Sequence, residues 1–142
     1  LRDMMKASSV ARAYSSADLS SKTDGRKPEE LLILLLDKAC SCLRRAAMLP
    51  MDTLEDTSWE ERLQITQDFH NNCSRAMQIV VALRELLDLE AGGELAAQLQ
   101  ETYTAIATTI WDASKAKNVG DLTKMLEALI ELRSAWETVA SG

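Results

Sequence analysis

The sequence is poor in the residues that interrupt helices and in those that favour strands. It has two Pro and five Gly, and aromatic residues make up 4% of its 142 residues. Pro and Gly disfavour helix interiors, whereas aromatic residues favour strands. Ala, Leu, Glu, Lys and Gln, which favour helices, are plentiful. We therefore predict an all-α chain, and its length and its hydrophobic content of 46% predict a single domain.

Long apolar runs are also missing. No run approaches the ~20 residues that span a bilayer, and the first residues lack the apolar core of a signal peptide. The three Cys are an odd number in a chain large enough to bury a core, which favours reduced thiols over a disulfide framework. These absences predict a cytosolic protein that does not insert into a membrane.

Basic charge is scarce after the first residues. Residues 1–27 carry six Lys or Arg and three Asp, whereas the remainder carries ten basic and nineteen acidic residues. An acidic body repels phosphates, and it lacks the basic stripe with interleaved aromatics that single-strand binders use, so we do not expect a nucleic acid partner. The opposite charges favour folding of the leader, residues 1–27, onto the body.

Catalytic and metal-binding patterns are weak. The single His has no paired Ser or Cys nucleophile, and Glu90 and Glu94, beside a turn, are more typical of solvated caps than of an acid and base pair. The atoms suited to zinc belong to Cys40, Cys42, His70 and Cys73. The first two lie about 200° apart around a helix, so both thiolates cannot readily reach one ion. No P-loop is present. We predict no enzyme, no metal and no cofactor.

Apolar spacing predicts a short, weak helix in the leader and four long helices after it. Pro28 opens the first long helix, Pro50 ends it, and Ser58 with Glu61 forms a capping box at the second. Apolar residues then recur at spacings of three and four, as in near-parallel helix packing. Short connections make this an antiparallel up-down four-helix bundle. The predicted helices span residues 28–49, 58–90, 94–117 and 121–140.

The apolar seam of the second helix is predicted to start at Trp59 and Leu63, and that of the third at Leu95. A Gly pair separates these two helices. Gly92 suits the left-handed residue that ends a helix, Gly93 allows a bend, and Glu94 falls in the next first turn. The pair therefore predicts the corner between the second and third helices.

Some apolar side chains exceed what a simple bundle needs. Ile33 and Leu34 fall on the charged side of their helix, and other surplus residues lie off their apolar stripes or in the leader. The complete set is Val10, Tyr14, Ile33, Leu34, Trp111 and Ile130. Either the leader packs on Ile33 and Leu34, or they are exposed. A weakly held leader over an apolar groove is also a plausible gate, because a displacing helix regains the burial at ~25 cal/mol per Å².

Four segments together resemble the flagellin export chaperone family, FliS. They are KPEELLILLLDKA (27–39), LDLEAGGELAAQL (87–99), the pair Ala135 and Trp136, and the pair Ala13 and Tyr14 in the leader. The Gly-Gly-Glu turn, followed by Leu, Leu and Tyr103, is the most specific of them. Trp136 stands eighteen residues after Asn118, a spacing similar to that of the family. The resemblance covers most of the chain.

The resemblance implies a cytosolic four-helix bundle that binds the disordered C-terminal segment of flagellin. Such a chaperone blocks premature polymerisation and delivers flagellin to the flagellar type III export apparatus. It implies client contacts at Val10, Tyr14 and Leu36, which we group with Ile33, Leu34, Trp111 and Ile130 from the apolar surplus. It implies structural roles for Gly92, Gly93, Glu94 and Trp136, the last in the core. A cochaperone or an anti-sigma factor stays open as a further partner.

The chain departs from the family pattern at several positions. Leu36, Asp37 and Lys38 stand where an aromatic residue, Asp and Gly are common, and Lys27 replaces Ser before the helix-opening Pro. The segment 50–62 is longer than is typical of the family. The resemblance in the leader places the usual start near Met5, so we expect residues 1–4 to be an extension. Two other hypotheses stay in competition. One is a self-associating bundle that dimerises through Ile33, Leu34 and Trp111, and the other is a small metal enzyme.

Overall fold

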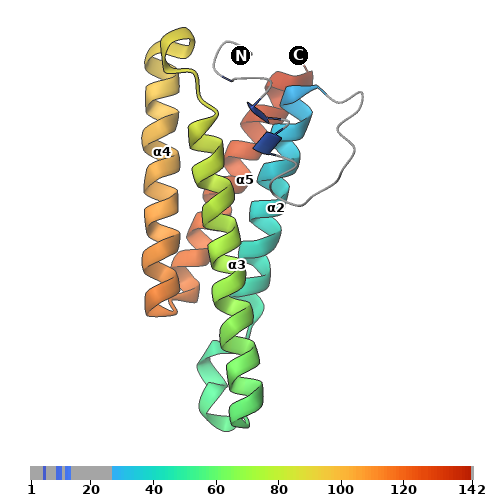
Figure 1. Cartoon of the computed structure of the whole chain (residues 1–142), viewed down its shortest axis with the longest axis vertical. Coiled ribbons are helices and arrows are strands. Elements are labelled where there is room, and N and C mark those ends of the chain that lie inside the picture. Colours follow the sequence, from blue (N-terminus) through green and yellow to red (C-terminus); the bar gives the residue numbers. More distant parts are fainter. Residues whose placement is uncertain (1–4, 6–8, 11, 14–26, 142) are drawn as a thin grey trace.

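The computed structural model describes residues 5, 9–10, 12–13 and 27–141, with side chains up to 138. Tyr14 and most of the leader therefore lie outside the described residues. The described chain is helical, as predicted, and four long helices dominate it (Figure 1). The elements are α2 (Pro28–Met48), the 3₁₀ helix η2 (Met51–Asp56), α3 (Trp59–Glu85), α4 (Leu89–Ala116) and α5 (Val119–Ser141).

The first two long helices begin and end where local chemistry requires. Pro28 opens α2 with Glu29 and Glu30 in its first turn, which suits the positive end of the helix dipole. The helix stops at Met48 because Leu49, which precedes Pro50, is extended. The backbone N–H of Glu61 donates to Ser58 Oγ at 3.2 Å and caps α3.

The corner between α3 and α4 differs from the prediction. Helix α3 ends at Glu85 rather than at residue 90, and α4 begins at Leu89 rather than at 94. The reason is Asp88, whose carboxylate accepts a hydrogen bond from Ala91 N at 3.1 Å and starts a helical turn before the Gly pair. Gly93, with φ 58° and ψ −136°, is the left-handed residue, not Gly92. Its non-helical backbone divides α4 into a first turn, which starts at Leu89, and a regular helix from Glu94 onward.

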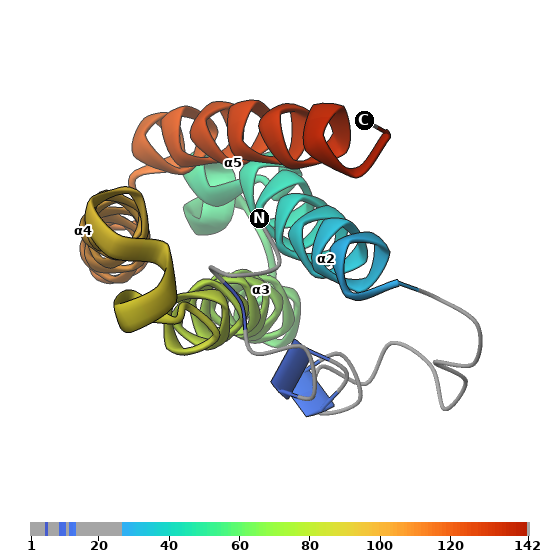
Figure 2. The same ribbon diagram turned by 90° about the horizontal axis from the view of Figure 1, so that it is seen from above.

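The four helices form an antiparallel bundle arranged as a ring. Helix α2 packs against α3 and α5, and α4 packs against α3 and α5, so α2 and α4 occupy opposite corners. Figure 2 shows this ring from above. The chain runs up and down through the ring in sequence order (Figure 1). This architecture matches the predicted all-α bundle.

The core follows the apolar seams, except at their ends. Phe69, Cys73 and Val80 of α3 have no exposed surface. Trp59 and Leu63, which the same seam predicts to be buried, are 68% and 49% exposed, and Leu95 of α4 is 53% exposed. The cause is position along the bundle, because an apolar stripe is buried only where another helix lies opposite.

Two described parts of the leader rest on the bundle. Met5 forms an isolated antiparallel bridge with Leu87, in the connection between α3 and α4, and both residues are buried. Val10 has no exposed surface and belongs to the core cluster. The described residues of the leader therefore fold onto the body, at the end of the bundle where α3 stops and α4 starts (Figure 1).

Candidate binding groove

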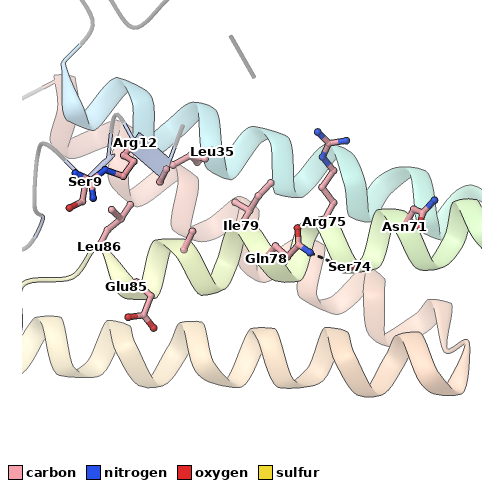
Figure 3. A pocket seen from close by; sticks show the side chains of 12 residues that line it. Ser9, Arg12, Leu35, Asn71, Ser74, Arg75, Gln78, Ile79, Glu85 and Leu86 are labelled. Atoms are coloured by element: carbon pink, nitrogen blue, oxygen red, sulfur yellow. Dashed lines mark hydrogen bonds between the residues drawn. The ribbon is translucent and has the colours of Figure 1, made fainter. Parts of the chain in front are cut away.

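A cavity of about 750 Å³ lies between α2, α3 and the leader (Figure 3). Its apolar wall combines residues from all three elements, and its polar wall is formed mainly by α3. The apolar lining residues are Ala13, Leu35, Ile79, Ala82 and Leu86, and the polar ones are Ser9, Arg12, Asn71, Ser74, Arg75, Gln78 and Glu85. An apolar surface with polar edges is suited to an amphipathic helix.

The α3 wall of the groove arises from a second apolar stripe. Ile79, Ala82 and Leu86 follow one another at spacings of three and four, next to the main seam of the same helix. These residues are absent from the sequence-predicted client set, because the spacing was interpreted as a single apolar face on this helix. The signal was present in their spacing, and a search for two adjacent stripes would have found it.

Cationic side chains from α2 and α3 act on the buried thiol of Cys42. Burial raises the pKa of Cys42, and the positive charges of Lys38, Arg75 and Arg45 act on this thiol in the opposite direction. Lys38 and Arg45 belong to α2, whereas Arg75 lines the groove from α3. The charged residues that line the groove itself are two cations, Arg12 and Arg75, and one carboxylate, Glu85.

The sequence-predicted client residues are scattered over the leader, α2, α4 and α5. Val10 and Leu36 have no exposed surface. Ile33 and Leu34 are half-buried against the core, whereas Trp111 is 52% and Ile130 40% exposed. None of these six lines the groove between α2 and α3. The groove therefore has a different residue set from the predicted one.

Ile33 faces away from this groove because of its helical position. Asp37, one turn later on α2, accepts a hydrogen bond from the guanidinium of Arg133 on α5. Residues four apart share a helix face, so Ile33 lies on the α5 side of α2. Leu35 instead lines the groove. Among the described leader residues, Ser9, Arg12 and Ala13 line the groove, and Ile33 is not part of its lining.

Trp136 of α5 is buried and contacts α4. Only 4% of its surface is exposed, and its Nε1–H donates to the hydroxyl of Tyr103 at 3.3 Å. Burial raises the pKa of Tyr103, and the hydrogen bond with Trp136 opposes that shift. The contact joins two residues that the sequence places in separate family-like segments.

A smaller cavity of about 230 Å³ lies between α3 and α4 and includes Trp111 in its lining. His70 Nδ1 and Ser114 Oγ are 3.0 Å apart across it, and Lys115 Nζ lies 5.2 Å from the centre of the Trp111 ring. Burial raises the pKa of Cys73 to about 11, although a hydrogen bond with Ser114 lowers it. Cys73 is therefore a neutral thiol near pH 7, a poor nucleophile and a poor metal ligand.

The predicted separation of Cys40 and Cys42 is visible in their surroundings. The pKa of Cys40 is raised by burial and influenced by Asp37 and Arg133 on the α5 side, whereas Arg75 of α3 acts on Cys42. Across the described residues, no group of three His, Cys, Asp or Glu side chains is placed to hold a metal ion. In the same part of the chain, no helix combines the length and apolar character needed to cross a membrane.

Comparison with known proteins places this bundle in a family. The pattern that defines the flagellar protein FliS family matches residues 10–142. The flagellar secretion chaperone FliSB of Pseudomonas aeruginosa is 26% identical over 138 residues, which cover 96% of this chain and 99% of the relative. The flagellar secretion chaperone FliS of Vibrio cholerae is 29% identical over 65 residues, covering 46% of this chain and 48% of the relative. The match covers the four long helices and the described leader residues from Val10 onward, which is well over half of the chain. This chain therefore belongs to the flagellar protein FliS family.

Proposed function

We propose that this protein is a flagellar export chaperone that binds the disordered C-terminal segment of flagellin. In this role it prevents premature polymerisation and assists delivery of flagellin to the flagellar type III secretion apparatus. Membership of the FliS family supports the chaperone role, as do the names of the two relatives. The observation that carries the proposal is the groove between α2 and α3, which has an apolar wall and unfilled space.

The groove suits a client that becomes helical on binding. Helical flagellin segments polymerise through apolar seams, and an apolar groove between two helices offers a substitute partner for such a seam. Ordering a disordered segment costs on the order of 2–5 kcal/mol, which keeps a large interface releasable. The exposed polar residues Asn71, Ser74 and Gln78 of α3 leave one side of the bound helix in contact with water.

The leader acts as a competitor for the same groove. Ser9, Arg12 and Ala13 line the cavity, and Val10 is buried at its side. A client helix that displaces these residues makes apolar contacts in their place. The exchange therefore changes the total buried apolar area only a little. The leader thereby covers apolar surface when no client is bound.

Ala82→Arg tests the groove. Ala82 is half-buried in the lining, and a guanidinium there fills space and places a charge on the apolar wall. Calorimetric titration with a flagellin C-terminal peptide is expected to show binding at least roughly tenfold weaker than wild type, about 1.4 kcal/mol. Ala97→Arg, at an exposed position of α4, is the matched control and should bind as wild type does.

The two outcomes that contradict the proposal are distinct. If the wild-type protein does not bind the peptide, the client assignment is wrong. If the wild type binds and Ala82→Arg binds equally well while its circular dichroism stays helical, the client uses another surface.

A further inference from the structure

The α2–α3 hairpin extends beyond the rest of the bundle. Figure 1 shows the lower end of α3 and η2 projecting past the lower ends of α4 and α5. The contact between His70 of α3 and Ser114 fixes this offset, because α4 ends at Ala116, just after Ser114. Helix α3 begins at Trp59, about three turns before His70. Those turns have no opposite helix from α4 or α5.

We define the hairpin tip as residues 48–63. Met48, Trp59 and Leu63 are 79%, 68% and 49% exposed, and these are three of the seven large hydrophobic residues exposed in the described chain. Trp59 and Leu63 are one turn apart and continue the seam that higher up buries Phe69 and Cys73. The tip therefore carries an unpartnered apolar stripe with the spacing of a helix-packing seam.

The tip is strongly acidic around this stripe. Its five acidic residues are all exposed, and they are Asp52, Glu55, Asp56, Glu60 and Glu61. Arg62 is the single basic residue between 48 and 63, and its guanidinium donates to the carbonyls of Leu54 at 3.1 Å and Thr57 at 3.4 Å. The nearest other cations in sequence are Arg44 and Arg45, in the preceding turn of α2.

The tip is also held in one shape. Thr57 Oγ1 donates to the carbonyl of Leu54 at 2.7 Å, and Ser58 caps α3. Together with the Arg62 contacts, these bonds fix the connection between η2 and α3. A surface that is ordered before binding loses less conformational entropy when a partner docks.

We propose that the hairpin tip docks an amphipathic helix of another protein, with Lys or Arg beside its apolar stripe. The spacing of Trp59 and Leu63 suits a helix as the partner. The five carboxylates favour a partner with Lys or Arg on both sides of its apolar stripe. A second copy of the tip would set these carboxylates against their equivalents, and an anionic lipid surface would be repelled in the same way. The tip lies at the opposite end of the α2–α3 hairpin from the described leader residues (Figure 1).

The test uses the full chain and a defined probe. The probe is a fluorescent peptide of about three heptads, with Leu at positions a and d and Lys at the flanking positions. A second peptide carries Glu in place of Lys. Fluorescence anisotropy should show binding of the Lys peptide to wild type, and binding of the Glu peptide at least roughly tenfold weaker because its charges face the carboxylates.

Leu63→Ser and Trp59→Ser should each weaken binding of the Lys peptide by roughly tenfold, since each removes apolar contact area. Leu95→Ser is the matched control, because Leu95 is 53% exposed beside Glu94 at the other end of the molecule, and it should leave binding unchanged. Equal weakening by Leu95→Ser would show unspecific attraction and overturn the proposal, as would equal binding of both peptides. Light scattering that shows a wild-type dimer dissociated by Trp59→Ser would assign the tip to a second copy instead.

Discussion

At the residue scale, single contacts join segments that are far apart in the sequence. Trp136 and Tyr103 meet in the core although they belong to different helices. Their burial could be predicted from apolar spacing, because each falls on the inward stripe of its helix. Their hydrogen bond could not, since it depends on the rotation of α4 relative to α5, which the spacing leaves undetermined.

Tyr103→Phe is expected to lower the free energy of unfolding by about 1–2 kcal/mol. The change leaves the buried indole N–H of Trp136 without its acceptor while preserving the ring volume. Urea denaturation followed by circular dichroism measures the effect. Thr108→Ala, at an exposed site on the same helix, should stay within about 0.5 kcal/mol of wild type. An unchanged midpoint for Tyr103→Phe would contradict this role.

Cys73 should make stability fall at alkaline pH. Its thiol ionises near 9.0 in the unfolded chain, whereas burial raises the folded pKa to about 11. The unfolded state therefore releases its proton first, so the stabilising contribution is complete below pH 9 and is lost as pH rises towards 11. The full contribution is about 2–3 kcal/mol.

The measurement compares wild type and Cys73→Ala by urea denaturation at pH 8 and at about pH 10.5, with reductant present. Burial also raises the pKa of Cys40 and Cys42, so both proteins lose stability over this interval. The variant should lose less of it, and equal losses in the two proteins would refute the assignment to Cys73.

At the element scale, the sequence predicted which segments are helical better than where they end. The N-cap at Ser58 and the helix opening at Pro28 are local signals, and the structure contains both, with Ser58 Oγ accepting from Glu61 N. The predicted end of the second helix at residue 90 was wrong, because α3 stops at Glu85 and an extra turn capped by Asp88 precedes the break at Gly93. Exposure of Trp59 was unpredictable from periodicity, since a seam does not show where the opposite helix stops.

Gly93→Ala should destabilise the protein by about 1–3 kcal/mol through backbone strain alone. An added Cβ meets nothing within 4 Å, so steric conflict with other residues is not the cause. A φ of 58° with a ψ of −136° is essentially restricted to Gly. Gly120→Ala is the control, because its Cβ would make only a 3.4 Å contact with Asn118 Oδ1. Thermal unfolding that ranks Gly120→Ala as the more damaging change would disprove this explanation.

At the scale of the whole molecule, the candidate groove depends on three elements that meet only after folding. The sequence predicted that the leader folds back and that apolar surface exceeds the needs of the bundle. It did not identify Leu35, Ile79 and Leu86 as the groove, because helical rotation and the path of the leader decide which apolar stripe remains open. Leu36 is the opposite case: the family resemblance predicts a client contact there, and the side chain has no exposed surface.

Deleting residues 1–13 should have opposite effects on stability and on client binding. The deletion removes buried Met5 and Val10, so the free energy of unfolding should fall by on the order of 3 kcal/mol. It also removes a competitor from the groove, so a flagellin C-terminal peptide should bind several-fold more tightly. Urea denaturation and calorimetry measure the two quantities. A truncated protein with unchanged or weaker peptide binding would show that the leader does not compete.

The packing of α2 against α5 also sets the order in which the protein can be completed during synthesis. The ion pair between Asp37 and Arg133 joins residues 96 positions apart. Helix α2 can pair with α3 as soon as that hairpin leaves the ribosome, but its other face has no partner until the last long helix emerges. Closing the ring is therefore a long-range step, expected to be slower than formation of the α2–α3 hairpin. Until then the nascent chain exposes the very kind of apolar helix face that the finished protein covers.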